Sequence, residues 1–528
     1  MKNSLAFLFF CARADETFRP PGASRFHMYR PESQKSRNEN FVLITNPFIV
    51  MNIFLTWLRN ILRKAFQKNL RTRRKKVRSR AVAALIFLCA LSGAWLFQAR
   101  LEGGNPSLVI KEPIDAIGIS RNVSISVADE KSGLRLLEVS LLKDGKTVDL
   151  LKKRFPYAGV VKGGKVKSES FTVLIEPEKL GISDGKAELR ASAVDYSWRR
   201  FFRGNRTYIQ KNVQIDTRPP RIKIISRRHA LIQGGAGLVI YRISEPCLRS
   251  GVRVGDRFYP GHAGYFEDKR VFMSFLAMGH NQGPGTVIFA EAVDLAGNRA
   301  KAGFPYYIMR KDFKRDRIRV SDAFINRKMP EFATEIPDNI KTSPVDHFLF
   351  VNRNLRKADS ARLQALCAES DPAVHWSGKF LRLPGSVRRA GFADHRIYQY
   401  KGRTIDYQIH FGIDLASVSK DGVPAANAGR VAAAERFGIY GKTVLIDHGH
   451  GLFSLYAHLS QTHVRKDQMV KKGDVIGLTG KTGLAAGDHL HFGMMINGSF
   501  VNPVEWWDPM WVKKNIEKKI ERAGLPVR

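Results

Sequence analysis

Residues 477–492, GLTGKTGLAAGDHLHF, decide how the C-terminal part of this chain folds. The glycines suit tight turns between short strands. The closing run His489-Leu490-His491-Phe492 alternates polar and apolar side chains, which is the period of a β-strand. Both imidazoles then face one side of the strand, and Leu490 and Phe492 face the core. The stretch therefore predicts two histidines that converge on one point.

Two motifs further upstream add a carboxylate and two more histidines. Residues 410–414 are HFGID, which gives H-x-G-x-D, and residues 456–459 are YAHL. Two histidines, one carboxylate and an open fourth position are typical of a catalytic zinc site rather than a structural one. The chain has 4 cysteines and no C-x-x-C pair, which argues against a thiolate-bound zinc site. It also lacks the H-E-x-x-H helix of the zincin peptidases.

The three motifs occur in the order found in lysostaphin-type (LytM) zinc endopeptidases, and the chain resembles this family over about residues 400–508. Residues 426–429 (ANAG) and 446–449 (IDHG) resemble further strand and turn segments of the family. At Gly493 the chain departs from many members, which have a glutamate after H-L-H-F. This departure affects a local charge partner but none of the motif positions.

The resemblance implies a set of site residues and a chemistry. It implies one zinc ion per chain, held by His410, Asp414 and His491. It also implies that His458 and His489 are catalytic histidines beside the metal. Zinc would activate a water for attack on a peptide bond, while the histidines handle protons and stabilise the oxyanion.

Other conspicuous residues near the motifs are predicted to have structural roles. His448 and His450 belong to a glycine-rich turn, and we expect turn or surface roles for them. The Asp394-His395 pair is expected on the surface, and Asp488 is expected to point to the strand face opposite His489. Three tryptophans are expected to pack the end of the domain: Trp506, Trp507 and Trp511.

An apolar run of residues 81–98 has the length of a membrane span. The basic cluster at residues 71–80 precedes it, so the positive-inside rule keeps that end in the cytoplasm and exports the chain beyond residue 100. A cleaved signal peptide is the alternative, with residues 92–94 (SGA) as the small-residue cleavage site. Both interpretations place the C-terminal part outside the cytoplasm. We also hypothesise that translation starts at Met51.

The exported part is dominated by a period of two. Hairpin turns are predicted at Asp144-Gly145 and Asp184-Gly185. A weak repeat, AVD followed by GN, occurs at residues 193–205 and again at 292–298, about one immunoglobulin-like module apart. Paired prolines in residues 216–220 predict a linker between the two modules.

We therefore expect a mainly β fold with an N-terminal membrane helix, two immunoglobulin-like β-sandwich modules, a short helical connector and a C-terminal all-β peptidase domain. The expected segments are 1–80 (basic, cytoplasmic), 81–98 (membrane helix), 105–218 and 219–318 (β modules), 319–395 (helical connector), 396–508 (zinc endopeptidase domain) and 509–528 (amphipathic terminal helix).

The leading functional hypothesis is a bacterial inner-membrane enzyme whose periplasmic part hydrolyses peptide cross-links or stems of peptidoglycan. A non-catalytic regulator that activates another cell-wall hydrolase is the alternative, and a peptidase acting on a protein substrate is a third. Partners would be peptidoglycan, the membrane and a cell-wall hydrolase or divisome protein. The net charge of +39 raises the question of nucleic acid, but the densest basic cluster lies beside the apolar run, so we expect no such partner.

Overall fold

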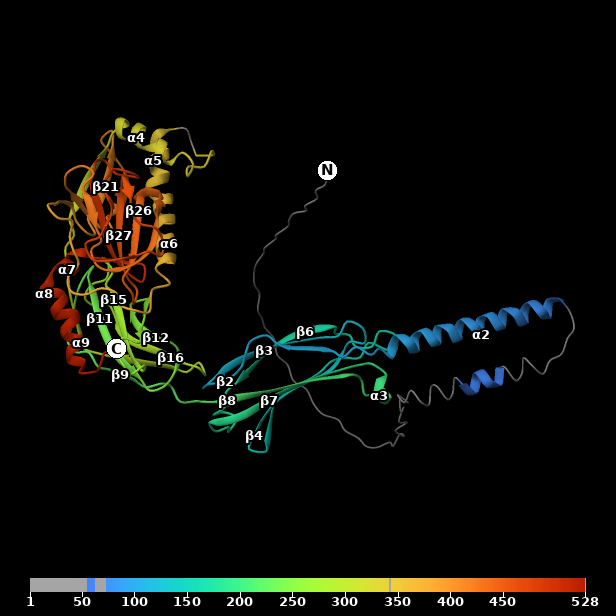
Figure 1. Cartoon of the computed structure of the whole chain (residues 1–528). Helices are drawn as coiled ribbons and strands as arrows, with labels where there is room; N and C mark the ends of the chain where they lie inside the picture. The colour runs from blue at the N-terminus through green and yellow to red at the C-terminus, as the bar shows by residue number, and fades with distance from the viewer. Residues whose placement is uncertain (1–54, 62–72, 341–342, 528) are drawn as a thin grey trace, which may run out of the picture. The chain divides into compact units, whose positions relative to one another are not determined.

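The computed structural model describes residues 55–61, 73–340 and 343–527. The chain divides into two compact units, residues 1–94 and 95–528. Helix α2 (Arg73–Arg100) contains Arg78–Gln98, which among the described residues is the one helix long and apolar enough to cross a membrane, judged by length and composition. The proposed start at Met51 and most of the basic N-terminal segment lie outside the described residues. From residue 107 onward the chain is mainly β, as the sequence predicts (Figure 1).

The first β module consists of two sheets with a common core. Their strand orders are β1-β3-β6 and β2-β8-β7-β4-β5. Alternate residues such as Val123, Ile125 and Val127 are buried, because successive side chains of a strand face opposite sides. The elements are β1 (Ser107–Ile110), β2 (Ala116–Ile117), β3 (Arg121–Ala128), β4 (Leu134–Lys143), β5 (Lys146–Arg154), β6 (Ser168–Ile175), β7 (Gly185–Asp195), α3 (Arg199–Phe202) and β8 (Arg206–Ile215).

Of the two predicted hairpin turns, one joins a hairpin and the other does not. Asp144 and Gly145 have φ of 49° and 77° and connect β4 to β5, which fits the type I′ turn that Asp-Gly favours. The prediction at Asp184-Gly185 was wrong, because β6 and β7 lie in different sheets. Asp184 instead accepts hydrogen bonds from the backbone N–H and hydroxyl of Thr217, both at 2.8 Å.

The second β module has two four-stranded sheets, with orders β14-β15-β11-β9 and β13-β12-β16-β17, and a short parallel pair, β10-β18. Its elements are β9 (Ile222–Ile224), β10 (His229–Ile232), β11 (Ala236–Ile243), β12 (Cys247–Val254), β13 (Arg257–Pro260), β14 (His262–Ala263), β15 (Val271–Ala277), β16 (Ile288–Asp294), β17 (Arg299–Gly303) and β18 (Tyr306–Met309).

The weak sequence repeat corresponds to the same local hydrogen-bond pattern in both modules. Asp195 accepts from the backbone N–H and side-chain amide of Asn205, at 2.7 and 2.9 Å. Asp294 accepts from the same two groups of Asn298, both at 2.9 Å. Each amide also donates to a backbone carbonyl of the segment that enters its module, including the Asp216 carbonyl at 2.6 Å. The repeat therefore fixes the start of each module.

Helices occupy the first part of the segment that was expected to be a helical connector. Further along, β20 lies inside that segment and pairs with β23 of the C-terminal sheet. Strand β19, at the start of the segment, pairs in parallel with β21. The elements are β19 (Arg315–Val320), α4 (Asp322–Lys328), the 3₁₀ turn η1 (Met329–Phe332), α5 (Pro344–Phe350), the π-helical turn η2 (Val351–Leu355), α6 (Arg356–Leu366) and β20 (Val387–Ala390).

The C-terminal domain is built on an antiparallel sheet with strand order β20-β23-β31-β27-β26-β25-β29, with β32 paired to β31. A second, small sheet has the order β24-β30-β28. The strands are β21 (His395–Tyr400), β22 (Arg403–Ile409), β23 (Ile413–Ala416), β24 (Gly422–Pro424), β25 (Gly429–Phe437), β26 (Gly441–Asp447), β27 (Leu452–Leu459), β28 (Gln461–Thr462), β29 (Met469–Val470), β30 (Val475–Leu478), β31 (Leu490–Ile496) and β32 (Ser499–Val501), with the 3₁₀ turn η3 (Gly438–Tyr440) before β26.

The C-terminal domain and the second β module share one core. A single cluster of buried apolar side chains includes residues of β11 and β15 together with residues of β23, β31 and the helix that follows the sheet. Trp506 is fully buried in it, 6.2 Å from Phe275 and 5.6 Å from Trp376 between ring centroids. The closing helices are α7 (Pro503–Trp507), α8 (Pro509–Val512), the π-helical turn η4 (Lys513–Glu517) and α9 (Lys518–Ala523).

Candidate metal centre and active site

Three adjacent strands bring the motif residues together. Asp414 on β23 lies directly opposite His491 on β31, so their side chains share one face of the sheet. On the other side of β31, His491 lies opposite Ala457 of β27, one residue before His458. Leu490 and Phe492, the neighbours of His491, are each 2% exposed and face the core, as predicted. The H-x-G-x-D and H-x-H motifs are therefore cross-strand neighbours.

His410, Asp414 and His491 converge on one point. The Nε2 atom of His410 lies 2.9 Å from Asp414 Oδ1 and 3.0 Å from His491 Nδ1. His491 Nδ1 lies 2.9 Å from the same carboxylate oxygen. All three residues are buried or nearly so, and they form one of the groups of side chains in the described chain that could hold a metal ion.

The protonation of this group favours a cation at its centre. His410 Nδ1 lies 2.8 Å from the Gly391 carbonyl, which can only accept, so Nδ1 carries the proton and Nε2 presents a lone pair. That lone pair faces a carboxylate oxygen and a second imidazole, so a cation between the three atoms would be bound by all of them. Two imidazole nitrogens and one carboxylate oxygen fit the donor set that zinc takes in catalytic sites.

A glycine leaves room for His491. A side chain at Gly412 would collide with His491 Nε2 and would lie 2.9 Å from the Phe492 carbonyl. This contact explains why the central position of H-x-G-x-D is glycine. His491 Nε2 itself is buried without a hydrogen-bond partner among the described residues. The His491 ring is therefore held by packing around Nε2, and its polar contacts are made through Nδ1.

A β-bulge directs His458 toward the same site. Between β26 and β27 the register shifts, so that Lys442 lies opposite Leu459 while Val444 lies opposite Tyr456. His458 has a φ of 64°, which is uncommon for a residue other than glycine. A bulge of this kind re-aims a side chain that regular alternation would point away. The imidazole centroid of His458 lies 4.9 Å from that of His489 and 5.7 Å from that of His491.

Both flanking histidines are oriented by backbone carbonyls. His458 Nδ1 donates to the Thr482 carbonyl at 2.8 Å, and His489 Nδ1 donates to the Gly487 carbonyl at 2.9 Å. In each neutral ring the Nε2 atom therefore keeps its lone pair. His489 Nε2 lies 3.6 Å from Asp414 Oδ1. The two side chains can consequently exchange protons or hydrogen-bond with a ligand beside the His410–Asp414–His491 group.

Burial and Asp414 set the charges of the site. Burial alone would raise the pKa of Asp414, but the surrounding imidazoles hold this pKa well below its usual value. Burial lowers the pKa of His491 to about 4 and lowers the pKa of His458 well below its ordinary value. Burial also opposes protonation of His489, but its contact with Asp414 raises its pKa overall. At neutral pH the site therefore contains neutral His458 beside a His489 that binds a proton more readily.

Comparison with known proteins places this region in a family. Residues 408–503 match the family described as peptidase family M23. The C-terminal domain is an M23 peptidase domain. This finding confirms the resemblance to lysostaphin-type endopeptidases that the motifs indicate.

Relatives with curated descriptions match over the M23 domain only. DD-carboxypeptidase/endopeptidase Mpg of Neisseria meningitidis serogroup B (strain ATCC BAA-335 / MC58) is 42% identical over 98 residues, 19% of this chain and 23% of that protein. Peptidoglycan DD-endopeptidase ShyA of Vibrio cholerae is 36% identical over 101 residues, 19% of this chain and 24% of that protein. The matches span about a quarter of the length of these relatives.

Among solved structures, the catalytic domain of lysostaphin from Staphylococcus simulans is similar to this chain. It is 24% identical, covers 25% of this chain and 98% of that domain, and has a TM-score of 0.22.

The sequence did not point to Arg396 or Asp394, which precede the region that matches the family, as part of the site. The Arg396 guanidinium donates to Asp414 Oδ2 at 2.7 Å, so it neutralises the carboxylate oxygen that faces away from the histidines. Asp394 was expected on the surface, but it is 5% exposed, and it accepts a hydrogen bond from the Gly391 N–H at 2.7 Å. It thereby supports the turn whose carbonyl orients His410. Neither residue belongs to one of the sequence motifs, so nothing in the sequence indicated that either of them is part of the site.

His448 and His450 belong to the turn, as expected, but neither lies on the surface. His448 is fully buried, and its two nitrogens contact the Ala428 carbonyl and the Ser454 hydroxyl, both at 2.7 Å. His450 is 1% exposed, and its Nε2 lies 2.9 Å from the Pro372 carbonyl. Both residues stabilise the core rather than the surface, because the turn that carries them is covered by the connector.

Two smaller observations explain other features of the M23 motifs. Asp488 accepts from the Ser419 hydroxyl at 2.9 Å and does not join the histidines, as predicted. A side chain at Gly493 would approach the ring of Phe500 to 3.1 Å, and Phe500 is stacked on Phe411. A glutamate has no space at this position unless Phe500 moves.

Proposed function

We propose that this protein is a zinc endopeptidase that cleaves peptide bonds in the cross-links or stems of peptidoglycan. The observation that carries the proposal is the convergence of His410, Asp414 and His491 within 3.0 Å, with two oriented histidines beside them. The M23 family membership of the domain supports a peptidase. Relatives named as peptidoglycan endopeptidases support the substrate class.

In this proposal His410, Asp414 and His491 hold one zinc ion. When bound, zinc supplies Lewis acidity that polarises the scissile carbonyl and makes a water nucleophilic at neutral pH. Arg396 pairs with Asp414 Oδ2 at 2.7 Å and fixes the orientation of the carboxylate. His458, which is neutral and presents a lone pair on Nε2, accepts the proton of the attacking water.

His489 has the complementary role. Its Nδ1 is fixed on the Gly487 carbonyl and its Nε2 lies 3.6 Å from Asp414 Oδ1, so in its protonated form it can donate a hydrogen bond from Nε2 to the oxygen that gains negative charge during attack. The same proton can pass to the leaving amine. His458 and His489 thus divide the base and acid work between them.

We further propose that the Arg78–Gln98 helix anchors the protein in the bacterial inner membrane and that the M23 domain lies in the periplasm. The basic residues ahead of the apolar run support this orientation. The two β modules, which we propose to be immunoglobulin-like, would then act as spacers between the membrane and the cell wall. Their paired, mainly antiparallel sheets support that assignment.

The full-length protein in detergent, incubated with isolated peptidoglycan, tests the proposal. We expect release of peptide-linked fragments, identified by mass spectrometry, together with about one bound zinc ion per chain. His491→Ala should lose both. His463→Ala is the matched control. His463 lies outside the site and is neither a proposed zinc ligand nor one of the two histidines beside the ligands. A folded, zinc-loaded protein that releases no fragment would contradict the enzymatic proposal and favour a regulator of another hydrolase.

A further inference from the structure

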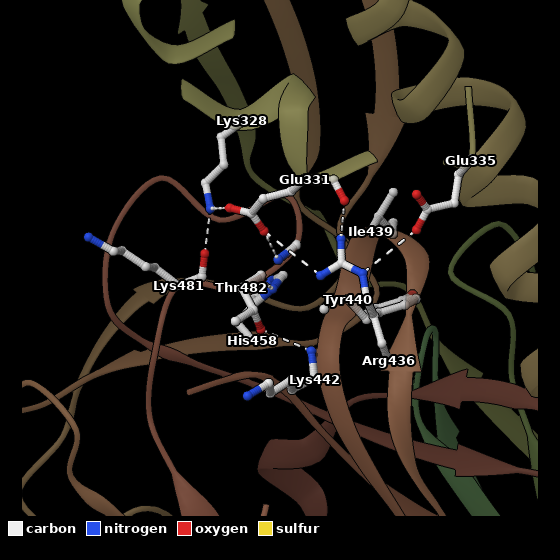
Figure 2. Close-up of polar contacts among 12 residues, drawn as sticks. Lys328, Glu331, Glu335, Arg436, Ile439, Tyr440, Lys442, His458, Lys481 and Thr482 are labelled. Atoms are coloured by element: carbon white, nitrogen blue, oxygen red, sulfur yellow. Dashed lines mark hydrogen bonds and ion pairs between the residues drawn. The ribbon is translucent and has the colours of Figure 1, made fainter. Parts of the chain in front are cut away.

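The orientation of His458 depends on the turn at residues 481–483. The Thr482 carbonyl accepts the hydrogen bond from His458 Nδ1 at 2.8 Å. The Thr482 hydroxyl accepts from the backbone N–H of Lys442 at 2.9 Å and donates to the Leu459 carbonyl at 2.8 Å. Figure 2 shows Thr482 between Lys481, His458 and Lys442. A shift of this turn would therefore rotate or release the imidazole.

One side of the turn is packed against the M23 sheet without spare volume. Gly483 has a φ of 69°, and a side chain there would collide with the backbone of Gly441 and Ile439. The N–H of Leu484 donates to the Ile439 carbonyl at 2.8 Å. On this side, contact with η3 and β26 fixes the turn.

The other side of the turn is held by two residues from outside the region that matches the family. Lys328, at the end of α4, donates to the Lys481 carbonyl and to Glu331 Oε1, the latter at 2.7 Å. Glu331, in η1, accepts from the Gly483 N–H through Oε2 at 2.9 Å. The pair thus binds the backbone on both sides of Thr482 (Figure 2).

The burial of Lys328 makes this contact specific. The residue is 2% exposed, and a buried ammonium group is costly unless it is paired and hydrogen-bonded. The Glu331 side chain is 33% exposed, so the pair joins a buried ammonium group to a carboxylate at the surface. Lys328 thereby connects Glu331 to the Lys481 carbonyl.

Arg436 of β25 anchors Glu331 in turn. Its guanidinium donates to the Glu331 carbonyl at 2.6 Å and lies 3.7 Å from Glu335 Oε1. In Figure 2 Arg436 lies between the two glutamates. The connector is therefore attached to the sheet through Arg436 and to the 481–483 turn through Lys328 and Glu331.

We propose that Lys328 and Glu331 are positioning residues for His458. They fix the 481–483 turn, and the turn fixes the tautomer and direction of the imidazole. The inference rests on the proposed peptidase function and extends it, because the connector upstream of the M23 match then completes the active site. Neither residue contacts His410, Asp414 or His491; both act through the turn.

The test compares Glu331→Ala and Glu331→Gln with wild type, as full-length protein in detergent. Glu435→Gln is the matched control, since Glu435 also joins the connector to the sheet, through Arg362 at 2.8 Å, but does not contact the turn. Three quantities are measured for each protein: zinc content, kcat and KM on a cross-linked peptidoglycan fragment, and hydrogen exchange of residues 478–486.

We expect Glu331→Ala to keep its zinc and its KM, to exchange the 478–486 backbone faster, and to lose about 10-fold in kcat, since small misplacements of a catalytic group have effects of this order. Glu331→Gln keeps an acceptor for Gly483 and should fall between Glu331→Ala and wild type. The control should match wild type in all three measurements.

Unchanged kcat and unchanged exchange in Glu331→Ala would overturn the positioning role, as would an equal loss of kcat in Glu435→Gln. If zinc-loaded wild type cleaves nothing, the proposed peptidase function fails instead. In that case the hydrogen-exchange measurement still tests the positioning role. If residues 478–486 exchange no faster in Glu331→Ala than in wild type, the positioning role is overturned.

Discussion

At the residue scale, the site separates side chains that would hold a metal from side chains that would move protons. His410, Asp414 and His491 meet within 3.0 Å of one another, whereas His458 and His489 approach with their rings and are oriented by backbone carbonyls. This division predicts different consequences for variants of the two groups. Loss of a group that moves protons should leave the metal in place.

His458→Ala is the variant that isolates proton transfer. We expect it to bind zinc as wild type does, because none of the three converging atoms belongs to His458. Its kcat should fall by about 100-fold or more, the usual contribution of a positioned general base. Zinc content by mass spectrometry and the rate of fragment release are the measurements. Zinc loss in this variant would show that His458 also supports the metal group.

Gly412→Ala tests the space around His491. The new methyl group would collide with His491 Nε2, so the ring must move and the three converging atoms must separate. We expect the zinc affinity to fall by about 10-fold or more, as for other residues that orient a ligand. Competition with a chelator measures it. Gly422→Ala is the control, because the new methyl group would meet only Val475, at 3.6 Å. An equal loss of zinc affinity in the two variants would contradict the prediction.

At the element scale, β-strand pairing explains what could be predicted from sequence. The alternation in residues 489–492 predicts the strand and its buried neighbours, and Asp144-Gly145 predicts a hairpin, because both signals are local. The bulge that re-aims His458 is set by pairing with β26, and no local pattern in YAHL shows it. Lys328 contacts Lys481, 153 positions away, and Glu331 contacts Gly483, 152 positions away. These contacts could not be predicted from the sequence either, because no local pattern reports a pairing between distant segments.

Gly441→Ala is the prediction that belongs to this scale. Gly441 has a φ of 64°, and a side chain there would collide with the backbone and hydroxyl of Thr482. We expect a loss of about 3 kcal/mol of stability from strain and displacement, with reduced peptidase activity. Gly402→Ala, at a φ of 80° with no neighbouring atom, should cost only about 1 kcal/mol and leave activity intact. Thermal unfolding measures the stability of the two variants, and fragment release measures their activity. Equal losses in Gly441→Ala and Gly402→Ala would exclude a role for the Thr482 contact.

At the scale of the whole molecule, the second β module and the M23 domain form one packed body. Sequence patterns place strands and motifs inside each segment, but they do not show that Trp506 packs against Phe275 across the boundary. The terminal segment was expected to be an amphipathic helix, and its apolar residues Val512 and Ile516 are buried. The Lys519 ammonium, however, donates to the Leu238 carbonyl of the second module at 3.1 Å. The helix therefore joins the two parts.

Glu505 gives this shared core a pH dependence. It lies in α7, is 6% exposed, and accepts from the Ala236 N–H of the second module at 2.7 Å. Burial raises its pKa from 4.5 to about 8, so the folded protein holds a proton that the unfolded chain releases. The stabilisation is complete below pH 4.5 and is lost as the pH rises through about 8.

Glu505→Gln should remove this dependence, because glutamine does not ionise and still offers an acceptor to Ala236. Relative to the variant, wild type should lose stability between about pH 5 and pH 8 with a slope of no more than about 1.4 kcal/mol per pH unit. Thermal unfolding of both proteins across that range measures the difference, which cancels the other titrating groups. Parallel curves would mean that Glu505 is ionised in the folded state and that the Lys311 charge, which favours ionisation, outweighs burial.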